Sequence, residues 1–222
     1  MTTLDDALVD VAHQLELSPK QLIKYADEDQ LPGYYDGGGQ YAIPYAADGK
    51  FLYALIRALK PETVLEVGTA QGGSARHIAE ALEANGNGRL ITVDVDQNST
   101  CEGIEYPVRR RITHNKFEAE SWLKGYVSLS ETFGGDLAGF DFIHEDGSHS
   151  AHLVHAIYGM LPQLMPRGGV IVSHDIGTGV ASDIRRGIQN AGFELPPEYI
   201  YDGSPCGFTV MKYKGVRSNE QE

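Results

Sequence analysis

Apolar and polar residues follow a helical spacing along the N-terminal part of the chain. The apolar residues within 4–15 recur every three or four positions, and Ser18 followed by Pro19 is typical of an N-cap and the first residue of a second helix. The segment 46–60 carries its apolar residues on one face and ends before Pro61. These patterns predict two short helices and a longer one ahead of the first strand.

Beyond this point, short apolar runs alternate with amphipathic stretches. Strands are expected at 63–67, 89–94, 110–113, 140–145, 168–176 and 207–213. Helices are expected at about 73–85, 117–130, 150–164 and 180–191. Because strands separated by helices are typical of a parallel sheet, we predict an α/β protein with a doubly wound sheet and helices on both of its faces.

Composition and charge narrow the choice of partners. The 222 residues, 41% of them hydrophobic, suit a single domain with a core of ordinary size. A formal charge of −13 would repel nucleic acid, so a small-molecule substrate is expected. Cys101 and Cys206 lie far apart, and no apolar run resembles a signal peptide or a membrane span. We therefore expect a cytoplasmic protein without membrane contacts.

A glycine-rich turn is the first candidate site. In the stretch VLEVGTAQGGSA, residues 64–75, Gly68, Gly72 and Gly73 lie between an apolar strand and a helix, where backbone N–H groups can approach a ligand. Their spacing differs from the G-x-G-x-x-G pattern of dinucleotide sites, and the next strand reaches Asp94, whose carboxylate can accept hydrogen bonds from ribose hydroxyls. These features favour S-adenosylmethionine, although any βαβ unit can carry a glycine turn and strand-end acids.

Acids and imidazoles at two further strand ends form a second candidate site. Asp146 follows one strand, and His174 and Asp175 follow the next. Neighbouring strand ends meet at one edge of a parallel sheet, and an oxygen-rich ligand set with an imidazole suits Mg²⁺ or Mn²⁺. The alternative is that these acids cap the helices that follow them.

Four stretches of the chain resemble a known family. They are YAIPYAADGKFLYALIRALKPETVLEVGTAQGGSA, LITVDVD, FDFIHEDGSH and PRGGVIVSHDI. Over about residues 40–176 and the last strand, the chain is similar to class I S-adenosylmethionine-dependent O-methyltransferases, in particular the metal-dependent catechol and caffeoyl-CoA type and the related small bacterial sugar O-methyltransferases. The resemblance implies a Rossmann-like, mostly parallel seven-stranded sheet and its strand order. Helices and a substrate-side loop would occupy 1–45, the methyltransferase domain 46–215, and a frayed tail 216–222.

The resemblance also implies roles for single residues. The cofactor would contact Glu66, Gly68, Thr69, Ala70, Gly72, Ser74 and Asp94. Ser74 would lie near the methionine carboxylate and Asp94 at the ribose. Asp146, His174 and Asp175 would bind a divalent metal, with Mg²⁺ expected, and a histidine stands at 174 where the family usually has an aspartate. His149 occupies the place of a lysine of catechol-type enzymes, and an imidazole there could act as the base.

The predicted function is methyl transfer from S-adenosylmethionine to a hydroxyl of a small molecule with the help of a divalent metal. Three alternatives remain open: a non-haem iron oxygenase using His144, Asp146 and His174, a non-catalytic S-adenosylmethionine-binding module, and methyl transfer to nitrogen or carbon. His144, within a strand, is expected to be a hydrogen-bonded interior residue. The acceptor pocket is expected to involve 31–45, the loop after Asp175 and 201–207.

Two features have two interpretations each. Tyr34, Tyr35, Tyr41 and Tyr45 would either form a lid over the substrate or pack their loop onto the sheet. The apolar stripes of the N-terminal helices would be covered in a homodimer or by the chain's own sheet.

Overall fold

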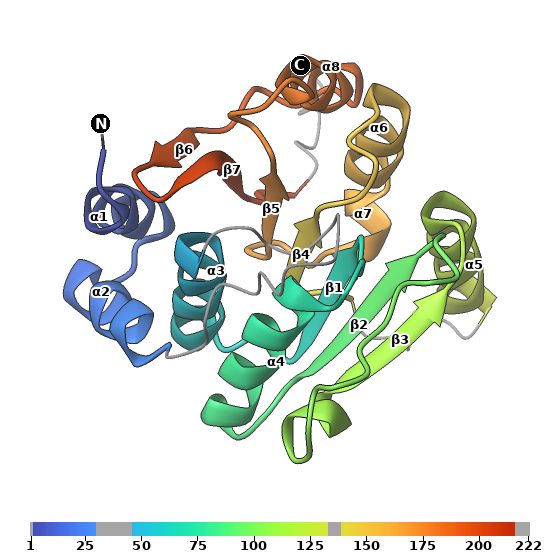
Figure 1. Cartoon of the computed structure of the whole chain (residues 1–222). Coiled ribbons are helices and arrows are strands. Elements are labelled where there is room, and N and C mark those ends of the chain that lie inside the picture. Colours follow the sequence, from blue (N-terminus) through green and yellow to red (C-terminus); the bar gives the residue numbers. More distant parts are fainter. Residues whose placement is uncertain (1, 30–45, 133–138, 216–222) are drawn as a thin grey trace.

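The computed structural model describes residues 2–29, 46–132 and 139–215. The helices are α1 (Leu4–Leu15), α2 (Pro19–Glu28), α3 (Ala46–Leu59), α4 (Gly73–Asn85), the 3₁₀ helix η1 (Val108–Arg111), α5 (Ala119–Thr132), α6 (Ala151–Gly159), α7 (Leu161–Leu164) and α8 (Ala181–Asn190). The strands are β1 (Thr63–Val67), β2 (Arg89–Asp94), β3 (Ile112–Lys116), β4 (Phe142–Glu145), β5 (Val170–His174), β6 (Glu198–Tyr201) and β7 (Ser204–Lys212). Figure 1 shows these elements along the chain.

The seven strands form one sheet in the order β3-β2-β1-β4-β5-β7-β6. Strand β7 runs antiparallel to both of its neighbours, and the pairs from β3 to β5 are parallel. The chain moves outward from β1 to β3 and then returns to place β4 on the other side of β1, so the winding reverses between β1 and β4. In doubly wound sheets, ligands bind beyond the carboxyl ends of the strands at this reversal.

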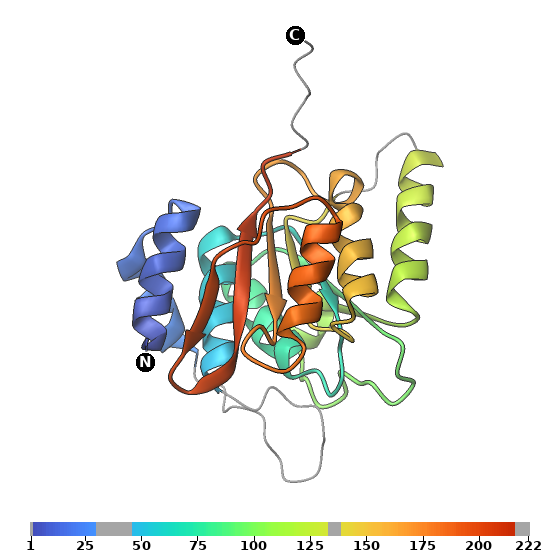
Figure 2. The ribbon, with the colours of Figure 1, turned by 90° about the horizontal axis from the view of Figure 1, so that it is seen from above.

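Alternation of side chains along each strand divides the core into two layers. Val64 packs with the helices from α1 to α4, whereas Leu65 points to the other face and packs with α5 to α8. Figure 2 shows the blue and cyan helices on one side of the sheet and the yellow-green to orange helices on the other. The predicted class, a mostly parallel seven-stranded sheet covered on both faces, is confirmed.

The N-terminal helices belong to the same core. Helix α1 begins with a capping box between Thr3 and Asp6, and its apolar stripe is buried. Gln14 ties it to the far edge of the sheet, because its amide donates to the Val210 carbonyl at 2.7 Å and its side-chain oxygen accepts from the Tyr199 hydroxyl. The stripes are therefore covered within the chain, because α1 and α2 pack on each other and on α3, and α1 also contacts β6. The homodimer remains a prediction, and these buried stripes give it no support.

Three elements show the main differences from the prediction. The strand expected at 110–113 starts at Ile112, because η1 occupies the preceding residues. The helix expected over 150–164 is divided at Met160, near Pro162, which has no N–H for an intrahelical hydrogen bond. Strand β6 is missing from the prediction, since its four residues alternate exposed and buried over too short a run to indicate a strand.

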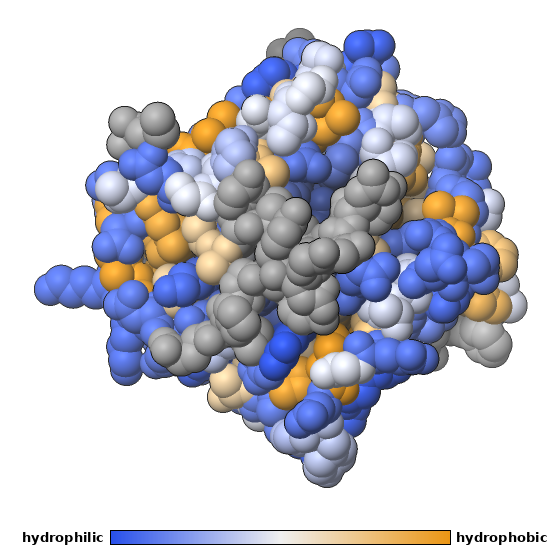
Figure 3. All heavy atoms as spheres, viewed as in Figure 1, coloured by the Kyte–Doolittle hydropathy of each residue, from blue (hydrophilic) through white to orange (hydrophobic). Residues whose placement is uncertain are grey.

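The surface of the described residues is largely polar. In Figure 3 hydrophilic residues dominate the visible described surface, and hydrophobic ones form separate small areas. Within the described ranges, none of the helices combines the length and apolar character needed to cross a membrane.

Candidate functional site

The glycine turn, residues 68–72, connects β1 to α4 at the reversal of the sheet. The Gly68 N–H donates to the Val93 carbonyl at 2.9 Å, and φ at Gly68 is 99°. A Cβ atom at this position would overlap the backbone carbonyl of Asp146. Glycine is therefore required, because the turn and the loop after β4 pack backbone to backbone.

Asp94 at the end of β2 fastens the turn from the other side. Its Oδ2 accepts hydrogen bonds from the N–H groups of Thr69 and Ala70, both at 2.8 Å, and its Oδ1 accepts from the N–H of Asp96. A carboxylate offers about four acceptor positions, so roughly one remains for a ligand hydroxyl. The predicted ribose contact can thus use one such position, while two others hold the turn in shape and one accepts from the Asp96 N–H.

Helix α4 starts with its positive end exposed to the turn. Its N-cap is Gly72, at φ 76°, which provides no side-chain cap, and Ser74 lies buried in the first turn of the helix. Uncapped N–H groups at a helix N-terminus form a site for an anionic group. This end of α4 suits the methionine carboxylate of the cofactor, which the resemblance implies to lie near Ser74.

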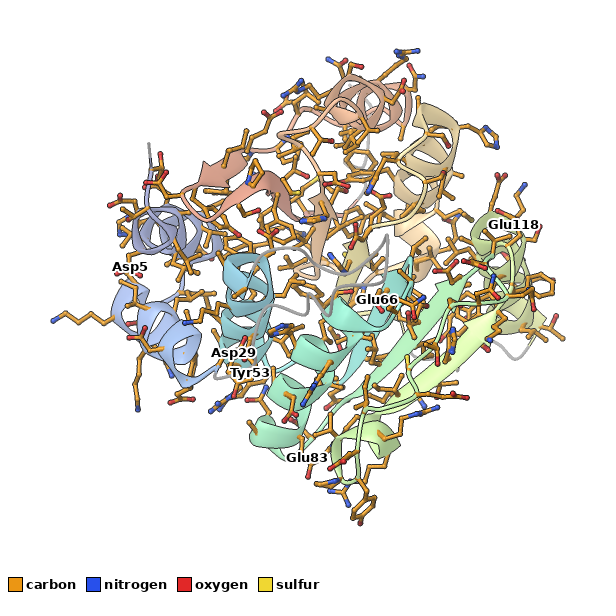
Figure 4. All side chains as sticks on the ribbon, viewed as in Figure 1. Asp5, Asp29, Tyr53, Glu66, Glu83 and Glu118 are labelled. Carbon is orange, nitrogen blue, oxygen red and sulfur yellow. The ribbon has the colours of Figure 1, made fainter. Side chains whose placement is uncertain are left out.

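Glu66 lies beneath the turn rather than beside it. Its side chain is fully buried, Oε2 accepts from the Thr92 hydroxyl at 2.6 Å, and Thr92 in turn accepts from Thr69 at 2.7 Å, because its own proton is used on Glu66. Figure 4 shows Glu66 at the centre of the molecule, whereas Glu83 and Glu118 lie at its periphery. Its contacts in the described part of the chain hold the turn on the sheet.

Two exposed apolar side chains adjoin Asp94, and the sequence analysis missed both. Val95 is 66% exposed and Phe117 is 54% exposed, each directly after the end of a strand. The two strands are paired up to Asp94 and Lys116, and the Phe117 N–H donates to the Asp94 carbonyl at 2.8 Å. In the sequence, these two residues stand out as apolar positions that follow two neighbouring strands. Because they lie beyond the strands, packing in the core does not explain their apolar character.

The acid–imidazole cluster consists of Asp146, His149, His174 and Asp175. Nε2 of His149 lies 3.2 Å from Oδ2 of Asp175 and 3.5 Å from Oδ1 of Asp146. Nδ1 of His174 lies 3.1 Å from the same Oδ1 of Asp146. The structure therefore brings together all four residues that the sequence assigned to metal binding and proton transfer.

Three of the four residues of this cluster place candidate metal-binding atoms close to one another. Asp146, His149 and Asp175 each place a donor atom within 4.8 Å of the others, whereas His174 falls in a second group with Asp48 and Cys206. Two carboxylate oxygens and one imidazole nitrogen, partly open to solvent through Asp146 and Asp175, suit a divalent cation such as Mg²⁺ or Mn²⁺. The residues present thus fit the metal that the resemblance implies.

The backbone at this cluster adopts an uncommon conformation. His149 has φ 51° and Asp175 has φ 64°, both in the left-handed region. Non-glycine residues in this region are uncommon, and such strain concentrates at functional sites. The two positive φ angles turn the two side chains toward each other, which supports a functional role for the pair.

Charge is balanced inside the cluster. Burial alone would lower the pKa of His149, but the neighbouring carboxylates of Asp146, Asp175 and Glu145 outweigh it and raise the pKa to about 12. In the same way, burial is outweighed by Asp146 and Asp48 at His174, whose pKa rises to about 10. Burial would raise the pKa of Asp146, yet the two imidazoles bring it below its usual range. The imidazoles therefore carry the positive charge that the carboxylates require.

Asp48, in the first turn of α3, is a further component that the sequence analysis missed. It is fully buried and accepts hydrogen bonds from the Tyr201 hydroxyl at 2.9 Å and the Ser204 hydroxyl at 2.6 Å, while Nε2 of His174 lies 3.2 Å away. Its partners are between 126 and 156 positions away along the chain, and no local pattern marks the contact.

Other predicted residues lie apart from the cluster. His144 is fully buried as expected, with Nδ1 3.4 Å from Glu66, and neither group of candidate ligands in the described ranges includes it. The iron site built on His144, Asp146 and His174 therefore has no support. The four tyrosines of the predicted lid and most of the predicted acceptor loop lie outside the described residues.

Replacing Gly68 tests the packing of the turn. Gly68→Ala is expected to destabilise the protein more than Gly86→Ala, although both glycines have positive φ, at which a side chain costs about 1–2 kcal/mol. Among the described residues nothing lies within 4 Å of a Cβ at Gly86, whereas at Gly68 it would overlap Asp146. Chemical denaturation gives both free energies of unfolding. Equal losses would show that the turn does not press on Asp146.

Comparisons with known proteins identify the family and the fold of the chain. A family model described as "Methyltransferase domain" matches residues 65–176, just over half of the 222 residues. No curated protein sequence matches the chain.

Solved structures share its fold. The O-methyltransferase TomG from Streptomyces achromogenes, in complex with S-adenosylmethionine, has a TM-score of 0.61 and 22% identity over 93% of this chain and 95% of that one. The O-methyltransferase from Bacillus cereus, in complex with S-adenosylhomocysteine, has a TM-score of 0.54 and 18% identity over 86% and 88%. The methyltransferase PaMTH1 from Podospora anserina has a TM-score of 0.54 and 14% identity over 89% of each chain. The chain therefore belongs to the methyltransferase-domain family and has the class I fold of S-adenosylmethionine-dependent methyltransferases.

Proposed function

We propose that the protein transfers the methyl group of S-adenosylmethionine to a hydroxyl oxygen of a small molecule, with a divalent cation at the acid–imidazole cluster. The observation that carries the proposal is the pair of carboxylates from Asp146 and Asp175, with the His149 imidazole beside them, next to the glycine turn. Donor and acceptor of the methyl group would then meet at one edge of the sheet, and their alignment is the main contribution of the protein.

The glycine turn would hold the cofactor. The uncapped start of α4 suits the methionine carboxylate, and the remaining acceptor position of Asp94 suits a ribose hydroxyl. The exposed side chains of Val95 and Phe117 would flank the adenine. The S-adenosylmethionine bound by TomG and the S-adenosylhomocysteine bound by the Bacillus cereus enzyme support this choice of ligand.

Asp146 and Asp175 would hold the cation between the ends of β4 and β5. When bound, a divalent cation lowers the pKa of a hydroxyl in contact with it and so favours an oxygen nucleophile. A metal-dependent O-methyltransferase needs acids at these two strand ends to hold the cation. A module that only binds the cofactor does not need them. Transfer to nitrogen or carbon would need no such cluster.

His149 would accept the proton of the acceptor hydroxyl at Nε2. The other ring nitrogen, Nδ1, lies 3.3 Å from the buried Glu145 carboxylate, which orients the ring. Because Asp146, Asp175 and Glu145 raise the pKa of His149 to about 12, the neutral form that can accept a proton requires another positive charge beside the two aspartates.

Removal of the cation tests the reaction class. Chelation with EDTA is expected to lower the rate of S-adenosylhomocysteine formation by about 100-fold or more on a panel of catechols and sugars, and Mg²⁺ should restore it. Asp175→Asn should have the same effect, whereas Asp183→Asn, at an exposed acid paired with Arg186 on α8, should not. Transfer that persists in EDTA, or a product with an N-methyl resonance by NMR, would contradict the proposal.

Replacement of His149 tests its role in proton transfer. His149→Ala is expected to lower turnover by roughly 100- to 10,000-fold while the affinities for S-adenosylhomocysteine and Mn²⁺ stay unchanged. His152→Ala, in the first turn of α6 and paired with Glu120 at the surface, is the matched control and should keep full turnover. A loss of Mn²⁺ affinity in His149→Ala would make His149 a metal ligand instead.

A further inference from the structure

The ring of His174 is enclosed between two carboxylates. Nδ1 lies 3.1 Å from Oδ1 of Asp146, and Nε2 lies 3.2 Å from Oδ2 of Asp48. The ring therefore bridges these two carboxylates, one on each side. Its nitrogen atoms fall outside the group of candidate ligand atoms that Asp146, His149 and Asp175 form.

The Asp48 side chain, on the Nε2 side of His174, is held in place by further hydrogen bonds. Its carboxylate is fully buried and also accepts hydrogen bonds from Tyr201 on β6 and Ser204 on β7. The ring of Phe208 adds a packing contact, with its centroid 4.7 Å from that of His174. Helix α3 and the β6–β7 hairpin therefore fix the far side of the imidazole. On its near side Nδ1 faces two acids of the acid–imidazole cluster, Asp146 at 3.1 Å and Asp175 at 3.7 Å.

We infer that His174 is a positioning residue that ties the Asp146 carboxylate to the buried Asp48 and does not itself bind the cation. This inference rests on the proposed function, because it takes Asp146 as a cation ligand. The hydrogen bond from Nδ1 uses one acceptor position of Oδ1 and orients the remaining ones. Such a residue does not touch the metal but contacts a residue that does. Its replacement typically weakens metal binding by roughly 10- to 100-fold.

The first test uses electron paramagnetic resonance to measure the Mn²⁺ affinity of protein variants. The replaced residues lie behind Asp146 and His174, too far from the proposed cation site to touch the ion. Asp48→Asn is expected to weaken Mn²⁺ binding by roughly 10- to 100-fold. Tyr201→Phe, which removes one donor to Asp48, should weaken it in the same direction by a smaller factor. Tyr199→Phe on the same strand removes a partly buried hydrogen bond to Gln14 and should leave Mn²⁺ affinity unchanged. Affinity for S-adenosylhomocysteine should be unchanged in all three.

The second test identifies the nitrogen ligands of the ion. Electron spin echo modulation of bound Mn²⁺ is expected to show the same nitrogen couplings in the wild type and in His174→Asn, whose amide still offers a donor toward Asp146. A coupling that disappears in His174→Asn would make His174 a ligand and overturn the inference. Wild-type affinity in both Asp48→Asn and Tyr201→Phe would overturn it as well. A wild-type protein that binds no Mn²⁺ would instead remove the proposed cation site, and the inference with it.

Discussion

The site depends on the repulsion between carboxylates that the sheet brings to one place. Asp146 and Asp175 follow adjacent strands, and with the buried Asp48 and Glu145 they concentrate negative charge in a protein whose formal charge is already −13. Like charges at short range in a poorly solvated site are costly unless positive groups lie between them. His149 and His174 occupy those positions, each with carboxylates beside both ring nitrogens. A divalent cation would meet the same need, which is why the cluster suits one.

Backbone packing couples this cluster to the glycine turn. Gly68 lies against the carbonyl of Asp146, and the Asp146 N–H donates to the Val67 carbonyl at 2.8 Å, so the start of the turn and the first acid of the cluster have fixed relative positions. Asp94 holds the other side of the turn through the N–H groups of Thr69 and Ala70. The parallel sheet supplies the shared edge, and these contacts set the spacing between the glycine turn and the acid–imidazole cluster.

The sequence predicted what local patterns determine. The doubly wound sheet, the helix after the glycine turn and the family are confirmed, since they follow from periodicity and from motifs in consecutive residues. The predicted site residues lie together, although their roles stay predictions. Asp48 was missed because its partners come from β5, β6 and β7, and only the folded sheet reveals them. Likewise, the sequence could not show that His174 faces two carboxylates.

A crystal structure with S-adenosylhomocysteine and millimolar Mn²⁺, recorded with anomalous scattering from manganese, tests the central claim most directly. We expect S-adenosylhomocysteine on the glycine turn and one anomalous peak in contact with Asp146 and Asp175. An ordered cofactor product on the turn with no manganese peak at these two carboxylates would contradict it.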